Sequence, residues 1–263
     1  MKPIFLILFA GCFFQITQQN FQLISSVAID ERTEVSQDRA GHIYIATYKG
    51  DIIRYDTDLQ NKLVFSPPNP NRATALEAWQ GLRIFSFHRD LQQFRLINRN
   101  LSLHEDYSFP QDIIGFAEMA TPSFDNNIWL IDQADFSLIK YDITSRLLIS
   151  RTPLEQLLDP DNYEILFLKE YQNRLFLSTK HRGILIFDNL GTYLKKFEYK
   201  NISSFNFEMD NMYFIEGNNL VEINLYSDHD VKRALPKNAP WLFAIIRDGR
   251  TYLFSKNQIS CYR

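Results

Sequence analysis

Short apolar or alternating runs recur along the chain at a nearly constant spacing. One phrase of six residues occurs six times, and typical copies are Asp51-Ile-Ile-Arg-Tyr-Asp56 and Gly183-Ile-Leu-Ile-Phe-Asp188. The copies begin at residues 51, 93, 137, 183, 219 and 258, which are 36 to 46 residues apart. Five of the six end in Asp or Asn, residues that open turns by hydrogen bonding to their own backbone. Each phrase is therefore predicted to be a β-strand followed by a turn.

Two further runs precede each phrase in a fixed order. The nearer set occupies residues 42–47, 82–87, 127–131, 174–179, 211–215 and 250–255. The set before it, predicted to form the innermost strands, occupies residues 34–38, 75–79, 114–119, 163–169, 203–209 and 241–246. Hairpin-length links join these runs, so the pattern predicts a meander that is repeated six times. A repeat of this length fits a four-stranded propeller blade.

A fourth, outer strand is predicted after five of the six phrases, at residues 62–66, 102–109, 147–151, 193–199 and 230–235. The sixth phrase ends at Arg263, while an unassigned apolar run, residues 21–29, lies at the other end of the sequence. Placing this run as the outer strand of the last blade closes the ring and pairs an open edge. The sequence therefore predicts an all-β, six-bladed β-propeller closed by an N-terminal strand. Only residues 152–159 are predicted to be helical, as a short turn between the third and fourth blades.

The first residues have the pattern of an export signal. Lys2 precedes an apolar run over residues 4–14, which is too short to span a bilayer and is followed by a polar stretch. We predict a signal peptide over residues 1–18 and a single propeller domain over residues 19–263. Phe9-Ala10-Gly11-Cys12 resembles a bacterial lipobox, which would make Cys12 a lipidation site; ordinary cleavage near residues 17–19 is the alternative. The protein is therefore expected to be periplasmic or associated with the outer membrane, with no transmembrane span in the mature chain.

Composition and charge narrow the range of partners. The chain is 45% hydrophobic and 22% charged, with 22 Phe and 13 Tyr, which favours half-buried strands over disorder. Its formal net charge is −3, and the basic residues form no longer run than pairs such as Lys195-Lys196. Phosphate backbones need a denser basic surface, so nucleic acid is not an expected partner.

One segment carries a resemblance to known propellers. Asp38-Arg-Ala-Gly-His-Ile-Tyr-Ile-Ala-Thr-Tyr-Lys-Gly-Asp-Ile-Ile-Arg-Tyr-Asp56 resembles the repeats of bacterial periplasmic propellers, notably the sensor propellers of two-component regulators and the NHL and quinoprotein-like superfamily. Residues 173–188 are similar to the same pattern. The resemblance implies a propeller fold and an extracytoplasmic setting, and it transfers no functional residue. The repeats and the N-terminal segment also resemble envelope proteins of the Bacteroidota.

Acidic residues on or beside the innermost strands are the candidates for metal-dependent chemistry. Six-bladed propellers of the gluconolactonase and paraoxonase type hold a divalent ion in the channel with Glu, Asn and Asp. The candidates here are Glu34, Asp38, Glu77, Glu118, Glu164 and Glu208. That family's characteristic motifs do not surround them, and no G-x-S-x-G or phosphate-loop motif occurs. We predict no catalytic, cofactor-binding or metal-binding residue and no cofactor.

Two tryptophans are the candidate ligand contacts. Trp79 and Trp241 fall on the predicted innermost strands, where they could stack on a sugar or a peptide at the channel mouth or else pack between blades. The sequence thus favours a non-catalytic binding or scaffolding propeller of the bacterial cell envelope, which engages a protein or a glycan through loops on one face. A metal-dependent lactonase and a periplasmic ligand sensor are the alternatives.

Overall fold

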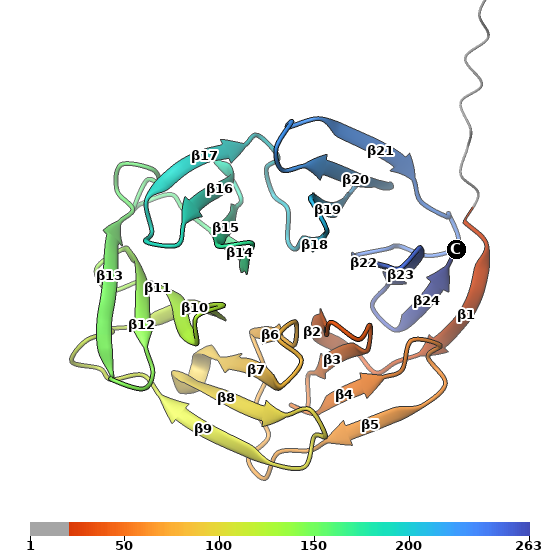
Figure 1. Cartoon of the computed structure of the whole chain (residues 1–263), viewed down its shortest axis with the longest axis horizontal. Coiled ribbons are helices and arrows are strands. Elements are labelled where there is room, and N and C mark those ends of the chain that lie inside the picture. The colour runs from red at the N-terminus through yellow and green to blue at the C-terminus, as the bar shows by residue number, and fades with distance from the viewer. Residues whose placement is uncertain (1–20) are drawn as a thin grey trace, which may run out of the picture.

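Six four-stranded antiparallel sheets form a closed ring, which confirms the predicted six-bladed β-propeller (Figure 1). This arrangement is seen in a computed structural model that describes residues 21–263. The predicted signal peptide and Cys12 lie outside the described residues. Within residues 21–263 there is no α-helix, and one 3₁₀ turn, η1 (Arg89–Leu91), connects two strands of the second blade. No helix in this range is long and apolar enough to cross a membrane.

Blades 1 to 5 each use one continuous stretch of chain, with the innermost strand first. Blade 1 contains β2 (Arg32–Gln37), β3 (Ile43–Thr47), β4 (Ile52–Tyr55) and β5 (Lys62–Phe65). Blade 2 contains β6 (Ala75–Glu77), β7 (Arg83–His88), β8 (Gln93–Asn98) and β9 (His104–Ser108). Blade 3 contains β10 (Ala117–Pro122), β11 (Asn127–Asp132), β12 (Ser137–Asp142) and β13 (Leu147–Pro153).

The remaining blades follow the same order until the last one. Blade 4 contains β14 (Ile165–Tyr171), β15 (Arg174–Thr179), β16 (Gly183–Asp188) and β17 (Tyr193–Phe197). Blade 5 contains β18 (Asn206–Glu208), β19 (Asn211–Glu216), β20 (Asn219–Asn224) and β21 (Asp230–Ala234). Blade 6 combines β22 (Phe243–Arg247), β23 (Arg250–Phe254) and β24 (Gln258–Tyr262) with β1 (Leu23–Ala28).

The N-terminal strand completes blade 6 as the sequence predicts. β1 pairs antiparallel with β24, so that Val27 lies opposite Ile259 and Ser26 opposite Ser260. Two backbone hydrogen bonds of 2.9 Å between Gln22 and Arg263 extend the ladder to the end of the chain. The two ends of the propeller are therefore held in one sheet, and the ring has no gap (Figure 1).

The aspartates that end the repeated phrase open turns in the predicted way. The Asp56 carboxylate accepts a hydrogen bond of 2.8 Å from Gln60 N, and the Asp188 carboxylate accepts one of 2.8 Å from Thr192 N. Each side chain thereby satisfies backbone donors in the link from the third to the fourth strand. The repeat is visible in the sequence because the same local chemistry recurs in several blades.

Apolar side chains between neighbouring blades form the core. Tyr44 and Ile52 of blade 1, for example, pack against Leu76 and Ile84 of blade 2 in one buried cluster. Each such side chain contributes roughly 1.5–3 kcal/mol when it is fully buried. Many of the Phe and Tyr side chains are buried in this core, because their flat rings fill the space between two facing sheets.

Several strand ends differ from the prediction; β18, for example, spans Asn206–Glu208 instead of residues 203–209. β10 begins at Ala117, not at residue 114, because the backbone N–H groups of Gly115 and Phe116 donate to the Asp132 carboxylate at 2.9 Å. The short helical turn expected over residues 152–159 is present but shorter, because β13 continues to Pro153 and the turn closes with a hydrogen bond of 2.8 Å from Leu158 N to Leu154 O. That turn buries Leu154 and Leu158 between blades 3 and 4.

Candidate functional site

The ends of the innermost strands define one face of the disc. Because every blade repeats the same meander, β2, β6, β10, β14, β18 and β22 cross the disc in one direction. The turns that follow them lie together on what we call the inner-turn face. They contain residues 38–42, 78–82, 123–126, 172–173, 209–210 and 248–249. The turn between β15 and β16, which carries His181, lies on the opposite face.

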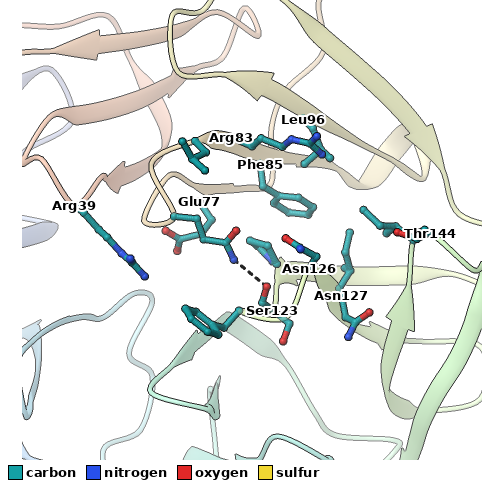
Figure 2. A pocket seen from close by; sticks show the side chains of 15 residues that line it. Arg39, Glu77, Arg83, Phe85, Leu96, Ser123, Asn126, Asn127 and Thr144 are labelled. Carbon is teal, nitrogen blue, oxygen red and sulfur yellow. Dashed lines mark hydrogen bonds between the residues drawn. The ribbon is translucent and has the colours of Figure 1, made fainter.

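A cavity of about 480 Å³ opens on the inner-turn face between blades 2 and 3. Phe85, Leu96 and Ile128 form apolar walls of this blade 2–3 cavity, and Arg39 and Arg83 bring positive charge to it. Figure 2 shows Phe85 in the middle of the cavity and Arg39 reaching in from the neighbouring blade. A mainly apolar concave surface with a few polar groups is the usual form of a binding site.

A second cavity of about 340 Å³ continues from the first toward the central channel. It is lined by Trp79 of blade 2 and by Tyr171 and Gln172 of blade 4. The two cavities share Arg39, Glu77, Gln80, Pro122 and Phe124, so we treat them as one groove across blades 2 to 4.

Two large apolar side chains are exposed along this groove. Leu82 is 72% exposed and Phe124 is 67% exposed, and each lies in a turn after an innermost strand. Both side chains line the concave surface, where they are accessible to another molecule. We take the groove as the candidate functional site.

Glu170 of blade 4 fixes the turn that carries Phe124. One carboxylate oxygen accepts hydrogen bonds of 2.6 Å from both Ser123 Oγ and Trp129 Nε1, and the other accepts one of 3.0 Å from Phe124 N. Charge-assisted hydrogen bonds of this kind are among the stronger ones in proteins. The backbone of the turn that carries Phe124 is therefore held in place by blade 4.

An ion pair between Glu77 and Lys169 lies at the floor of the groove. The two side chains are 11% and 9% exposed, and they connect blade 2 to blade 4 past the innermost strand of blade 3. The other oxygen of Glu77 accepts hydrogen bonds from Ser36 Oγ at 3.1 Å and from Trp79 N at 2.8 Å. Both oxygens of Glu77 are thus engaged, and the carboxylate stabilises the floor.

The structure places the two predicted tryptophans at opposite ends of innermost strands. Trp79 follows β6, is half-buried, and lines the groove, with the guanidinium carbons of Arg39 and Arg247 lying 5.9 and 5.5 Å from its ring centroid. Trp241 precedes β22, is 5% exposed, and donates a hydrogen bond of 2.8 Å to the carbonyl of Pro236. Ligand contact by either residue stays a prediction, and only Trp79 is at the groove.

The six candidate carboxylates are not brought together. Asp38 holds a turn, Glu77 pairs with Lys169, and Glu164 forms an exposed pair with Lys180 at 2.7 Å. Among residues 21–263, no three His, Cys, Asp or Glu side chains are grouped so that they could hold a metal ion. Each candidate therefore has its own local environment.

Cys261 is the one cysteine within the described residues. It is fully buried on β24, and burial raises the pKa of its thiol. This agrees with the sequence pattern, which places it in an alternating strand. Its side chain packs in the core between blades 6 and 1.

Glu34 on β2 is expected to make folding stability depend on pH. Burial raises the pKa of Glu34 from 4.5 to about 8, against the opposing positive charges of Arg32 and Arg72. Between these pH values the folded protein keeps a proton that the unfolded chain has lost, so stability falls as the pH rises through this window. Between pH 5.5 and pH 8, the free energy of unfolding of wild type should fall by on the order of 2 kcal/mol more than that of Glu34→Gln. Urea denaturation at the two pH values measures this difference.

The matched control for this prediction is Glu164→Gln. The Glu164 side chain is half exposed, so the control should keep the wild-type pH dependence. Equal pH profiles for wild type and Glu34→Gln would show that Glu34 does not carry a buried proton.

Comparison with solved structures shows how widely this fold is shared. A streptogramin B lyase matches with a TM-score of 0.64 and 12% identity, over 93% of this chain and 97% of that chain. The extracellular domain of a proposed one-component system from B. thetaiotaomicron matches with a TM-score of 0.59 and 12% identity, over 88% of this chain and 33% of that chain. BamB from Moraxella catarrhalis matches with a TM-score of 0.52 and 11% identity, over 93% of this chain and 100% of that chain.

These matches confirm the propeller fold. At such low identity they show the fold alone, and they transfer no site residue. No protein-family model matches the chain, and no curated protein is significantly similar to it in sequence.

Proposed function

We propose that this protein is a non-catalytic binding module that engages a protein partner through its inner-turn face. The groove across blades 2 to 4 carries the proposal, because it combines a concave apolar surface with the exposed side chains Leu82 and Phe124. The core of a protein–protein interface has the same character, with apolar and aromatic anchors inside a polar rim.

The polar groups of the groove support binding more than catalysis. The carboxylates Glu77 and Glu170 are occupied by Lys169 and by the Phe124 turn, and the Tyr171 hydroxyl donates a hydrogen bond of 2.8 Å to Met209 O. A general acid or base needs to reach the atom whose proton it transfers. These groups instead link different blades around the groove.

We further propose that the protein works in the bacterial cell envelope. The export signal predicted over residues 1–18 supports this location, as does the likeness to an extracellular domain. The same likeness favours ligand sensing as the second candidate function, and a sensor would use the same groove. Cell fractionation with detection of the mature N-terminus tests the location, and recovery of an uncleaved chain in the cytoplasm would overturn it.

Photo-crosslinking from the groove tests the binding function. With a photoreactive phenylalanine analogue in place of Phe124, we expect one discrete crosslinked protein in intact cells of the source organism. The same analogue at His181, which is exposed on the opposite face, should give none. Adding Leu82→Glu should reduce the crosslink at least about tenfold, because it puts a charge into an apolar contact. Equal crosslinking from the two faces, or none from either, would contradict the proposal.

A further inference from the structure

A small cavity of about 160 Å³ lies beside the groove, between blades 1 and 2 on the inner-turn face. Arg39 reaches it from the β2–β3 turn, Arg54 from β4, and Arg99 from the β8–β9 turn. We call it the arginine pocket, and its lining residues are Asp38, Arg39, Ala40, His42, Arg54, Gly81 and Arg99. Sites for drug-sized ligands measure about 300–1,000 Å³, so this pocket fits a single small group.

The positive charge of the pocket has no ion-pair partner in the part of the chain that the structure describes. No carboxylate within residues 21–263 forms an ion pair with Arg39, Arg54 or Arg99. The pocket does contain Asp38, but the oxygens of that carboxylate accept hydrogen bonds from Ala40 N, His42 N and Tyr44 OH at 2.9–3.0 Å. They also lie 2.9 Å from His42 Nδ1, so Asp38 is used to hold its own turn.

Neighbouring blades hold the arginines in this arrangement. Arg54 Nη1 donates a hydrogen bond of 2.7 Å to the carbonyl of Arg99, across the boundary between blades 1 and 2. Arg247 Nη2 of blade 6 donates one of 2.9 Å to the carbonyl of Arg39. The guanidinium groups of Arg39 and Arg247 both lie near the ring of Trp79, so two positive charges are close to one indole. Arg247 lies 3.4 Å from the Asp248 carboxylate, so the charge without an ion-pair partner at this indole is that of Arg39.

We propose that the arginine pocket binds the carboxylate of an acidic side chain in an extended segment of the protein partner. This rests on the proposed function, because Arg39 lines the arginine pocket and both cavities of the groove. An apolar side chain next to the carboxylate then reaches Phe85 and Phe124 in the groove. The planar guanidinium fork suits a carboxylate, and the apolar walls suit the adjacent side chain.

Selection from a displayed library of random twelve-residue peptides on the purified protein tests this proposal. The selected peptides should carry Asp or Glu beside an aromatic or aliphatic residue. Each guanidinium lost should weaken binding of a selected peptide roughly tenfold, so Arg39→Met/Arg99→Met should weaken it about a hundredfold. Binding should also weaken severalfold as salt rises from about 0.05 to 0.5 M, because the contacts are exposed to screening.

The control is Arg182→Met, which removes one exposed guanidinium from the opposite face and should leave peptide affinity unchanged. Arg39 and Arg99 are themselves exposed, so a melting temperature close to that of wild type checks that the double variant is folded. Replacing the peptide's Asp or Glu by Asn or Gln should cause at least the loss seen in the double variant, which keeps Arg54.

The outcomes separate this proposal from the proposed function. Peptides that need Phe124 but bind Arg39→Met/Arg99→Met as well as wild type would overturn the carboxylate site and leave the binding face intact. Tighter binding of a synthetic peptide with phosphoserine in place of the selected Asp or Glu would overturn the assignment of a carboxylate. Peptides that need neither Phe124 nor the arginines would overturn both proposals.

Discussion

A chain that begins at residue 30 is expected to lose cooperative folding, whereas a chain that begins at residue 21 should keep it. The shorter chain lacks β1, so β24 becomes an open edge and loses the backbone ladder that holds blade 6 to the start of blade 1. It also lacks Ile29, which is 8% exposed and packs with Val35 and Ile45 of blade 1. The loss should be at least roughly 5 kcal/mol, comparable to the whole stability of a typical domain. Chemical denaturation followed by circular dichroism, with size-exclusion chromatography, measures it.

Two aspartate variants refine this test within the intact chain. Ile29→Asp puts a charge into the core and should destabilise the protein by about 2–4 kcal/mol. Ile24→Asp is the matched control in the same region, because Ile24 is exposed, and it should change stability by less than about 0.5 kcal/mol. The chain that begins at residue 30 is compared with the chain that begins at residue 21 by its urea midpoint and by the slope of unfolding free energy against urea concentration. Equal values for the two chains would show that β1 does not close the ring.

The closure of the ring could be predicted because it depends on counting strands. Each blade repeats the same pattern of four strands. No fourth strand follows Gln258–Tyr262, and one unassigned strand is predicted over residues 21–29, so the second can be assigned to the place of the first. The local sequence pattern predicts strand ends less well where a side chain from another strand accepts the backbone hydrogen bonds. The start of β10 is such a place, since Asp132 holds the N–H groups of Gly115 and Phe116 from the neighbouring strand.

The groove was less predictable than the fold, because its residues meet only across blades. The carboxylate of Glu170 lies 41 to 47 positions from its partners, and Lys169 reaches Glu77 across 92 positions. No motif in one sequence carries such pairings. The available signal was weaker: aromatic and charged residues at the ends of innermost strands, where a closed ring brings them near the channel. Trp79 was found in this way, whereas the three arginines of the pocket were not.

Lys169→Met is expected to destabilise the protein by roughly 3 kcal/mol, measured by urea denaturation at pH 7. The substitution keeps an apolar stem of similar length but leaves the carboxylate of Glu77 buried without its counter-charge. It should also lower the Phe124 crosslink, because the ion pair joins blades 2 and 4 beneath the groove. Lys180→Met is the matched control, since Lys180 pairs with Glu164 on the surface and should contribute less than about 1 kcal/mol.

The second substitution decides whether the lost stability belongs to the pair. Glu77→Gln in the Lys169→Met background should recover most of the loss, because an uncharged amide can still accept from Ser36 and Trp79 without a buried charge. Breaking a buried ion pair is costly mainly through the partner that remains, whereas replacing both partners is often nearly neutral. Strictly additive losses in the double variant would mean that Glu77 and Lys169 act independently, and that blades 2 and 4 are joined beneath the groove by other contacts.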